Sequence, residues 1–162
     1  MNRKNVHKED EMKLFSKIND QFESLYNKEE IQITEVTTND IAQIIDIARI
    51  PIPEMLKSIL EEGVIYGIKI RDTSIIINFC YAVDIINVND NYPCFKEDVK
   101  EGIIFATDLG DNVYYYGNGR EGIGLYIVGA GDGDFYGEAT KFANTFEDFF
   151  IEGIGIDILK AY

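Results

Sequence analysis

The sequence predicts an α+β fold, in which helices pack on one face of an antiparallel sheet of about five to six strands. Apolar residues first recur at helical spacing, and after Gly63 the spacing changes to that of strands. A meander of three short strands follows between Gly102 and Val128, and an aromatic helix lies near the C-terminus. Helices, then antiparallel strands, then a helix is the order typical of this class.

The composition indicates one ordered domain with a strong negative charge. The chain has 162 residues, of which 46% are hydrophobic, and this is enough for a real core. Its 15 Lys and Arg residues against 29 Asp and Glu give a net charge of −14. Because nucleic acids and anionic membranes attract basic proteins, this charge argues against both as partners. It permits a basic protein partner, and solubility is the alternative explanation.

Nothing in the sequence predicts export or membrane insertion. Cys80 and Cys94 form no CxxC pair, which favours a reducing compartment. The N-terminal residues lack the apolar segment of a signal peptide. The longest apolar run, Ile75 to Ile86, is shorter than the roughly 20 residues that cross a bilayer. We therefore expect a cytoplasmic protein.

The first helical signal lies in residues 10–29, where apolar side chains recur every three or four positions. We assign this amphipathic helix to an N-terminal extension, residues 1–30, and residues 31–162 to a single domain. The apolar side of the helix either packs on that domain or forms a dimer or partner surface.

Two further helices are expected before the sheet and one after it. Thr37–Asp40 predicts a capped helix start. Pro53 begins the next helix, which Gly63 ends in a left-handed conformation. Thr145 opens the last helix, with Asp148 in a variant of the capping box.

Strands are expected where β-branched and aromatic residues gather: Val64–Ile70, Ile75–Tyr81, Ile103–Phe105, Val113–Tyr116 and Leu125–Val128, with a short extended segment at Ile31–Val36. Asn118 and Gly119 predict a two-residue type I′ turn, because both tolerate positive φ. Residues 84–100 and 129–137 are expected to be irregular, apart from a helical turn at 96–99.

No catalytic or metal-binding constellation stands out. Residues 117–122 match a dinucleotide fingerprint by letter, but a strand rather than a helix follows them. Residues 132–143 begin like a calcium loop, yet Tyr136 and Ala143 stand at two ligand positions. His7 is the only histidine, which argues against Ser-His-Asp and Cys-His catalysis and most zinc sites. We expect no enzyme activity, no metal and no cofactor.

Four motifs, in order, resemble those of one family. They are the helix pair TTNDIAQIIDIARIPIPEMLKSIL from Thr37, then Gly63 and a hydrophobic strand, then Phe105-Ala106 with Asp108, Gly110 and Asp111 before the YYY strand, and finally an acidic loop and the helix TFEDFF from Thr145. From about Thr37 to Phe150 the chain resembles the SUKH superfamily, which includes yeast cell-wall-assembly regulators and bacterial immunity proteins. It departs from that family in having Glu61-Glu62-Gly63 where Asn-Gly-Gly is common, and in lacking tryptophan.

The resemblance implies a non-catalytic immunity protein, or antitoxin, that binds and occludes a cognate protein toxin such as a basic nuclease. The alternative is a regulatory protein-binding scaffold like the cell-wall regulators. Charge supports a basic partner independently, because residues 101–162 hold three Lys and Arg against eleven Asp and Glu, 3 − 11 = −8. We expect a monomer or weak homodimer that contacts neither nucleic acid nor membrane.

The predicted partner-binding surface combines acidic and aromatic residues of the second half of the chain. Its acidic members and apolar anchors are Asp108, Asp111, Asp132, Asp134, Glu138, Tyr114, Tyr116 and Phe135. The acidic residues would supply negative potential, and tyrosine is enriched in protein interfaces. A turn role is the alternative for Asp108 and Asp111, because short carboxylates accept backbone N–H bonds.

Overall fold

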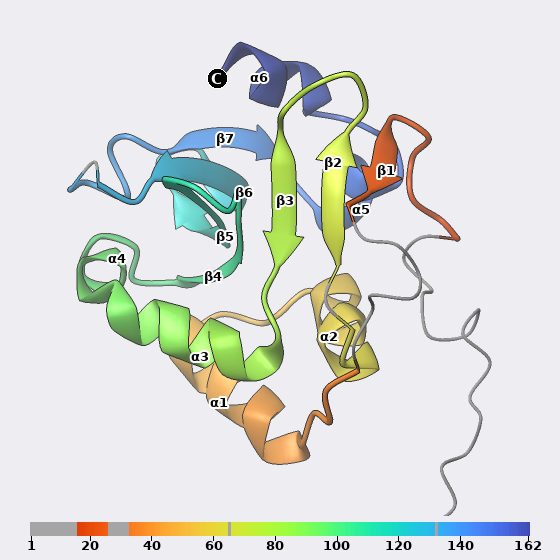
Figure 1. Ribbon diagram of the computed structural model, residues 1–162. Helices are drawn as coiled ribbons and strands as arrows, with labels where there is room; N and C mark the ends of the chain where they lie inside the picture. Colours follow the sequence, from red (N-terminus) through yellow and green to blue (C-terminus); the bar gives the residue numbers. More distant parts are fainter. Residues whose placement is uncertain (1–15, 26–32, 65, 132) are drawn as a thin grey trace, which may run out of the picture.

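The computed structural model describes residues 16–25, 33–64, 66–131 and 133–162. In this part of the chain, seven strands form one curled antiparallel sheet whose spatial order follows the chain order (Figure 1). The strands are β1 (Phe22–Ser24), β2 (Gly67–Ile70), β3 (Ile76–Phe79), β4 (Gly102–Thr107), β5 (Asn112–Gly119), β6 (Gly122–Gly129) and β7 (Thr140–Ala143). The helices are α1 (Thr38–Ala48), α2 (Glu54–Glu62), α3 (Ala82–Asn91), α4 (Pro93–Asp98), α5 (Phe146–Phe150) and α6 (Ile156–Ala161). The α+β class is confirmed, and the strand count of five to six is corrected to seven.

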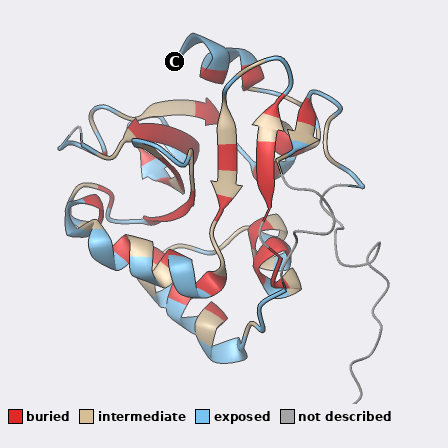
Figure 2. Ribbon diagram, in the orientation of Figure 1, coloured by how far each residue is buried: buried red, intermediate tan, exposed pale blue. Residues whose placement is uncertain are grey.

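The sheet carries a hydrophobic core on each of its faces. The larger core joins α1, α2, α3, α5 and α6 to strand residues such as Phe105 and Tyr114. On the opposite face, Phe95 of α4 packs with Ile104 and Tyr115 in a smaller core. Figure 2 shows buried residues along the strands and exposed residues on the outer sides of the helices. The expectation that helices cover one face only is therefore wrong for α4.

Residues 16–25 form a turn and the edge strand β1 rather than part of the predicted helix. A turn leads into β1, and β1 pairs with β2 so that Phe22 lies opposite Ile70. The Phe22 ring lies 5.2 Å from Phe149 and 5.8 Å from Phe150, measured between ring centroids. This aromatic contact outweighs the helical spacing of the sequence. The helix predicted at 10–29 is wrong for 16–25, and the rest of it lies outside the described residues.

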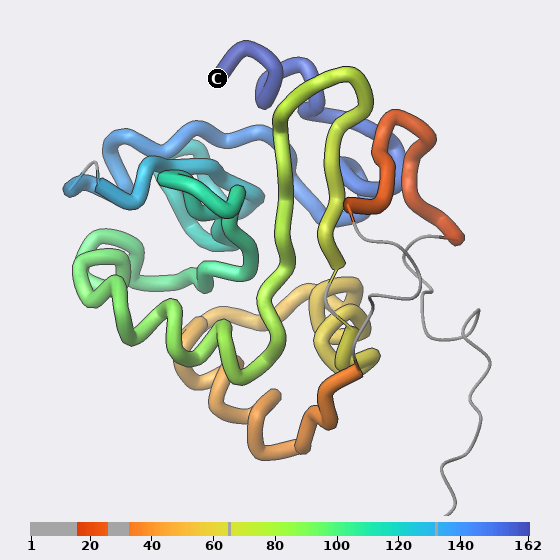
Figure 3. Tube along the Cα trace, viewed as in Figure 1, coloured from red at the N-terminus to blue at the C-terminus, as the bar shows by residue number. Residues whose placement is uncertain are grey.

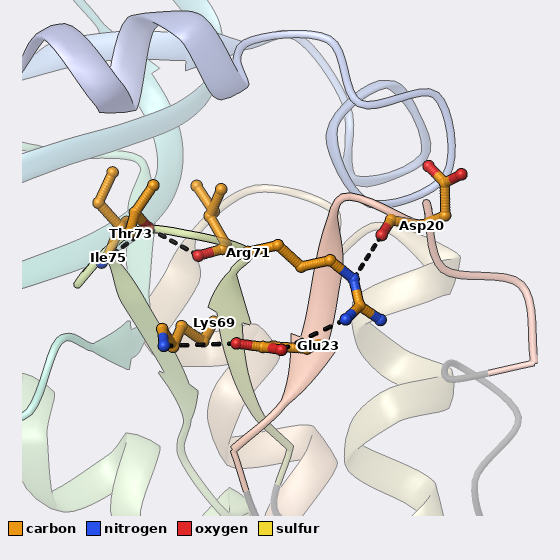
Figure 4. A network of polar contacts seen from close by, with 7 residues as sticks. Asp20, Glu23, Lys69, Arg71, Thr73 and Ile75 are labelled. Carbon is orange, nitrogen blue, oxygen red and sulfur yellow. Dashed lines mark hydrogen bonds and ion pairs between the residues drawn. The ribbon is translucent and has the colours of Figure 1, made fainter.

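A polar network on the outer face holds β1 to β2 (Figure 4). The Arg71 Nε donates to the carbonyl oxygen of Asp20 at 2.8 Å, and its Nη1 lies 3.3 Å from the Glu23 carboxylate. The same carboxylate lies 3.3 Å from the Lys69 Nζ. The side chains of these ion pairs are 35–54% exposed, so we attribute the docking of β1 mainly to Phe22 and only slightly to charge.

The predicted start of α1 and end of α2 are confirmed, and α2 begins at Glu54, one residue after the predicted Pro53. Thr37 Oγ1 accepts a hydrogen bond from the Asp40 N–H at 3.1 Å, and the Asp40 carboxylate accepts one from the Thr37 N–H at 2.9 Å. This capping box starts α1. Gly63 ends α2 with a φ of +65°, and a Cβ there would collide with the carbonyl oxygen of Thr34. Only glycine satisfies both conditions at this position.

Helix α3 occupies part of the stretch that the sequence predicts as irregular. Its buried residues Ala82, Ile85 and Asn89 have helical spacing, but the polar Asn89 interrupts the apolar pattern by which a helix is predicted. The Asn89 side-chain amide donates to the carbonyl oxygen of Ile104 at 3.1 Å and accepts from the Ile104 N–H at 3.2 Å. A β-bulge lies beside Ile104 in β4. The Asn89 amide thus satisfies the buried N–H and C=O groups of Ile104, as a neighbouring strand would.

The hairpin of β5 and β6 turns two residues later than predicted. Gly119 and Gly122 still pair, so Arg120 and Glu121 form the turn, and Gly122 takes the positive φ of +84°. The Tyr126 hydroxyl accepts from the Glu121 N–H at 3.1 Å and donates to the Gly122 carbonyl at 2.6 Å. The type I′ turn at 118–119 is wrong because Tyr126 stabilises the later turn.

The C-terminal part completes the larger core. Thr145 Oγ1 accepts from the Asp148 N–H at 3.0 Å and starts α5, as the sequence predicts. Strand β7, which the sequence does not predict, precedes this cap, and α6 lies at the opposite end of the molecule from α1 and α2 (Figure 3). No helix within the described ranges combines the length and apolar character needed to cross a bilayer.

Candidate functional site

A hollow of about 480 Å³ lies between α2 and α5. Its apolar lining comes from Met55 and Ile59 of α2 and from Ile151 after α5. Its charged lining consists of three glutamates and one lysine: Glu54, Glu62, Glu147 and Lys17. A hollow with apolar walls and a few convergent charges is the usual form of a binding site.

A second hollow of about 360 Å³ shares Glu54 and Glu147 with the first. Its other walls include Pro51, Ile52 and Tyr116 of β5. The two hollows therefore meet at the two shared carboxylates. We call the joined depression the α2–α5 groove.

Local sequence places both shared carboxylates in the first turn of a helix. Pro51 and Pro53 separate α1 from α2, so that Glu54 is the first residue of α2. The Thr145 cap likewise puts Glu147 in the first turn of α5. Helix dipoles favour acidic residues at these positions. Both side chains are exposed, and neither forms a hydrogen bond or ion pair with another described residue.

The third glutamate of the groove is held by the protein itself. The Tyr66 hydroxyl donates to the Glu62 carboxylate, and Tyr66 is buried between α2 and the sheet. Lys57 pairs weakly with Glu61 at 3.9 Å, and neither residue lines the groove. Glu54 and Glu147 are therefore the groove carboxylates best placed to meet a cation from outside.

Of the predicted contact residues, Tyr116 lies in this groove. Its ring is half-buried, 6.0 Å from Phe146 between centroids, and burial raises the pKa of its hydroxyl. Tyr114 points to the same face of the sheet but is only 1% exposed, and its hydroxyl donates to the Ile76 carbonyl at 2.9 Å. Tyr114 is therefore a core residue, and its role as an exposed anchor is corrected.

Phe135 is the second predicted anchor that the fold buries. It is 3% exposed and packs against Phe95 on the smaller core, on the face opposite Tyr116. Its N–H donates to the Asp98 carboxylate at 2.9 Å, and its carbonyl accepts from the Tyr115 hydroxyl at 3.2 Å. The loop around Phe135 thus closes the smaller core instead of presenting an anchor.

Two of the predicted acidic contacts have partners within their own loops. The Asp108 carboxylate accepts from the N–H groups of Gly110 at 2.8 Å and Asn112 at 3.1 Å. The Asp134 carboxylate accepts from the N–H groups of Tyr136 at 3.1 Å and Gly137 at 2.7 Å. Both carboxylates stabilise turns, which was the alternative for Asp108.

The remaining predicted acidic residues give no compact site. Asp111 and Glu138 are exposed, and Asp132 lies outside the described residues. The predicted contact set is therefore divided between two faces of the sheet, with Tyr116 alone in the α2–α5 groove. Within the described ranges, no group of His, Cys, Asp and Glu side chains has a metal-binding arrangement.

Sequence reasoning missed Glu54 and Glu147 because they lie far apart in the chain. Each is a common residue at the start of a helix, so neither forms a motif alone. The proline-flanked start of α2 and the Thr145 cap indicate two helix N-termini, but only the packing of α2 against α5 brings them together.

The two cysteines are expected to differ strongly in reactivity. Burial, reinforced by Asp84, raises the pKa of the Cys80 thiol to about 12, while Cys94 is exposed. A raised pKa leaves less thiolate at neutral pH, and the thiolate is the reactive form. With a disulfide reagent at pH 8, we expect one thiol per native chain to react fast and the second only after unfolding in urea. The variant Cys94→Ser should lose the fast phase, and fast labelling of Cys80 would contradict the packing of β3.

The chain was also compared with known proteins. No family model matches it, and no curated protein shows significant similarity to it.

Proposed function

We propose that this chain is a non-catalytic immunity protein that binds and occludes a cognate protein toxin, with a basic protein such as a nuclease as the preferred partner. The observation that supports this most is the α2–α5 groove, in which apolar walls meet two outward carboxylates. The net charge of −14 supports a basic partner as well. Opposite charges steer association and suppress wrong partners.

To occlude its partner, the chain needs only a surface that covers the partner's active site. Protein interfaces combine an apolar centre with a polar rim, and the groove offers both on a small scale. Its carboxylates would compete for the Lys and Arg side chains with which a nuclease holds phosphates. We expect the chain to act in the cytoplasm as a monomer or weak homodimer, without metal or cofactor.

Affinity capture tests this function. The tagged chain is isolated from its own cells at low and then moderate salt, and the partner is identified and purified. We expect one basic protein in a 1:1 complex, and we expect the purified chain to inhibit the activity of that protein. Several unrelated partners would instead indicate a regulatory scaffold. A stoichiometric partner whose activity the chain leaves unchanged would contradict occlusion.

A further inference from the structure

We infer that the α2–α5 groove takes an apolar peptide segment of the partner that carries an arginine or lysine, with the cationic group between Glu54 and Glu147. This inference rests on the proposed function and names the part of the partner that the groove recognises.

Charge complementarity selects a cation as the central group. Three of the four charged residues that line the larger hollow are glutamates, and Lys17 is the fourth. Glu62 is already bonded to Tyr66, whereas Glu54 and Glu147 line both hollows. A guanidinium or ammonium group at their junction would meet a carboxylate from α2 and one from α5. Such charge-assisted hydrogen bonds are stronger than neutral ones.

The walls on either side select apolar neighbours for that cation. Met55 and Ile151 are partly buried on one side of the junction, and Ile52 and Tyr116 are partly buried on the other. The exposed parts of these side chains release water when an apolar side chain of the partner covers them, which favours binding. Met55 adds adaptability, because its unbranched chain changes shape at little cost. A segment with a central cation and apolar residues before and after it therefore fits both hollows at once.

The probe is a synthetic nine-residue peptide with a central arginine flanked by leucine and proline, labelled for fluorescence anisotropy. Its control carries citrulline, which keeps the shape of arginine and lacks the charge. We expect saturable binding to the full chain, and at least roughly tenfold weaker binding of the citrulline peptide. No saturable binding, or equal binding of both peptides, would overturn the inference.

Matched variants distinguish binding in the groove from non-specific attraction to the acidic surface. Glu54→Gln with Glu147→Gln removes two charges at the groove, and Asp111→Asn with Glu138→Gln removes two exposed charges elsewhere. We expect the first pair of substitutions to weaken binding of the arginine peptide roughly tenfold, and the second pair to change its binding less than about twofold. Equal losses in both pairs would overturn the inference. Thermal unfolding of each variant checks that the fold is kept.

The captured partner distinguishes the two proposals. If the groove variant still binds and inhibits that partner at full strength, the groove inference fails and the proposed function stands. If the wild-type chain binds the arginine peptide but inhibits no partner, the proposed function fails and the groove remains a peptide site.

Discussion

Replacing Asn89 with leucine is expected to lower the free energy of unfolding by about 2–6 kcal/mol. Asn89 is 3% exposed, and its amide bonds to both backbone polar groups of Ile104. Leucine has a similar size but cannot form these bonds, so a buried N–H and a buried carbonyl lose their partner. Each such loss costs about 1–3 kcal/mol. Urea unfolding followed by circular dichroism measures the difference.

Asn87 provides the matched control for this substitution. It lies in the same helix but is exposed, so Asn87→Leu should change stability by less than about 0.5 kcal/mol. Equal effects of the two variants would mean that the Asn89 amide does not support β4. A stabilised Asn89→Leu variant would contradict the account of α3 more strongly.

The substitution Phe150→Ala is expected to cost about 3–5 kcal/mol, the range for emptying a fully buried aromatic site. Its ring is 0% exposed and joins three elements. Between ring centroids it lies 5.8 Å from Phe22 of β1, 5.3 Å from Phe79 of β3 and 4.8 Å from Phe149 of α5. Truncation leaves a cavity that these rings cannot fill by small movements.

Two further variants define the cause of that loss. Phe150→Leu keeps most of the buried volume and should lose clearly less stability than Phe150→Ala. Tyr136→Ala removes an aromatic ring that is 41% exposed, and it should have little effect. A loss below about 1 kcal/mol for Phe150→Ala would contradict the packing of α5 on β1 and β3.

The sequence predicts those elements whose signals are local. The caps at Thr37 and Thr145 and the left-handed Gly63 depend on neighbouring residues, and the structure confirms all three. The alternation of Tyr114 and Tyr115 between the two faces of the sheet also follows from the strand period.

The errors arise where distant residues decide the conformation. Phe22 joins a strand because Phe149 and Phe150 lie next to it, although its own neighbours have helical spacing. Asn89 occupies a core position of α3 because the bulged strand β4 needs a hydrogen-bonding partner there. In the sequence, a polar residue at that position makes the segment look like a loop. The β5–β6 turn moves because Tyr126, beyond the turn, binds it.

The candidate site was predictable only in part for the same reason. Composition indicates an acidic surface for a basic partner, but it does not tell which acidic side chains stabilise turns. Asp108 and Asp134 do so, whereas Glu54 and Glu147 meet through the contact of α2 with α5. Tyr116 is the predicted contact that the fold leaves beside those two carboxylates.

Hydrogen exchange of the chain, alone and in complex with the captured partner, tests the groove account most directly. We expect slower exchange on binding in residues 54–59 of α2, around Tyr116 in β5, and in residues 145–151 at α5. The loop around Phe135 should be unchanged, because it closes the smaller core on the other face. Protection confined to that loop or to the exposed end of the sheet near Asp111 would contradict the account.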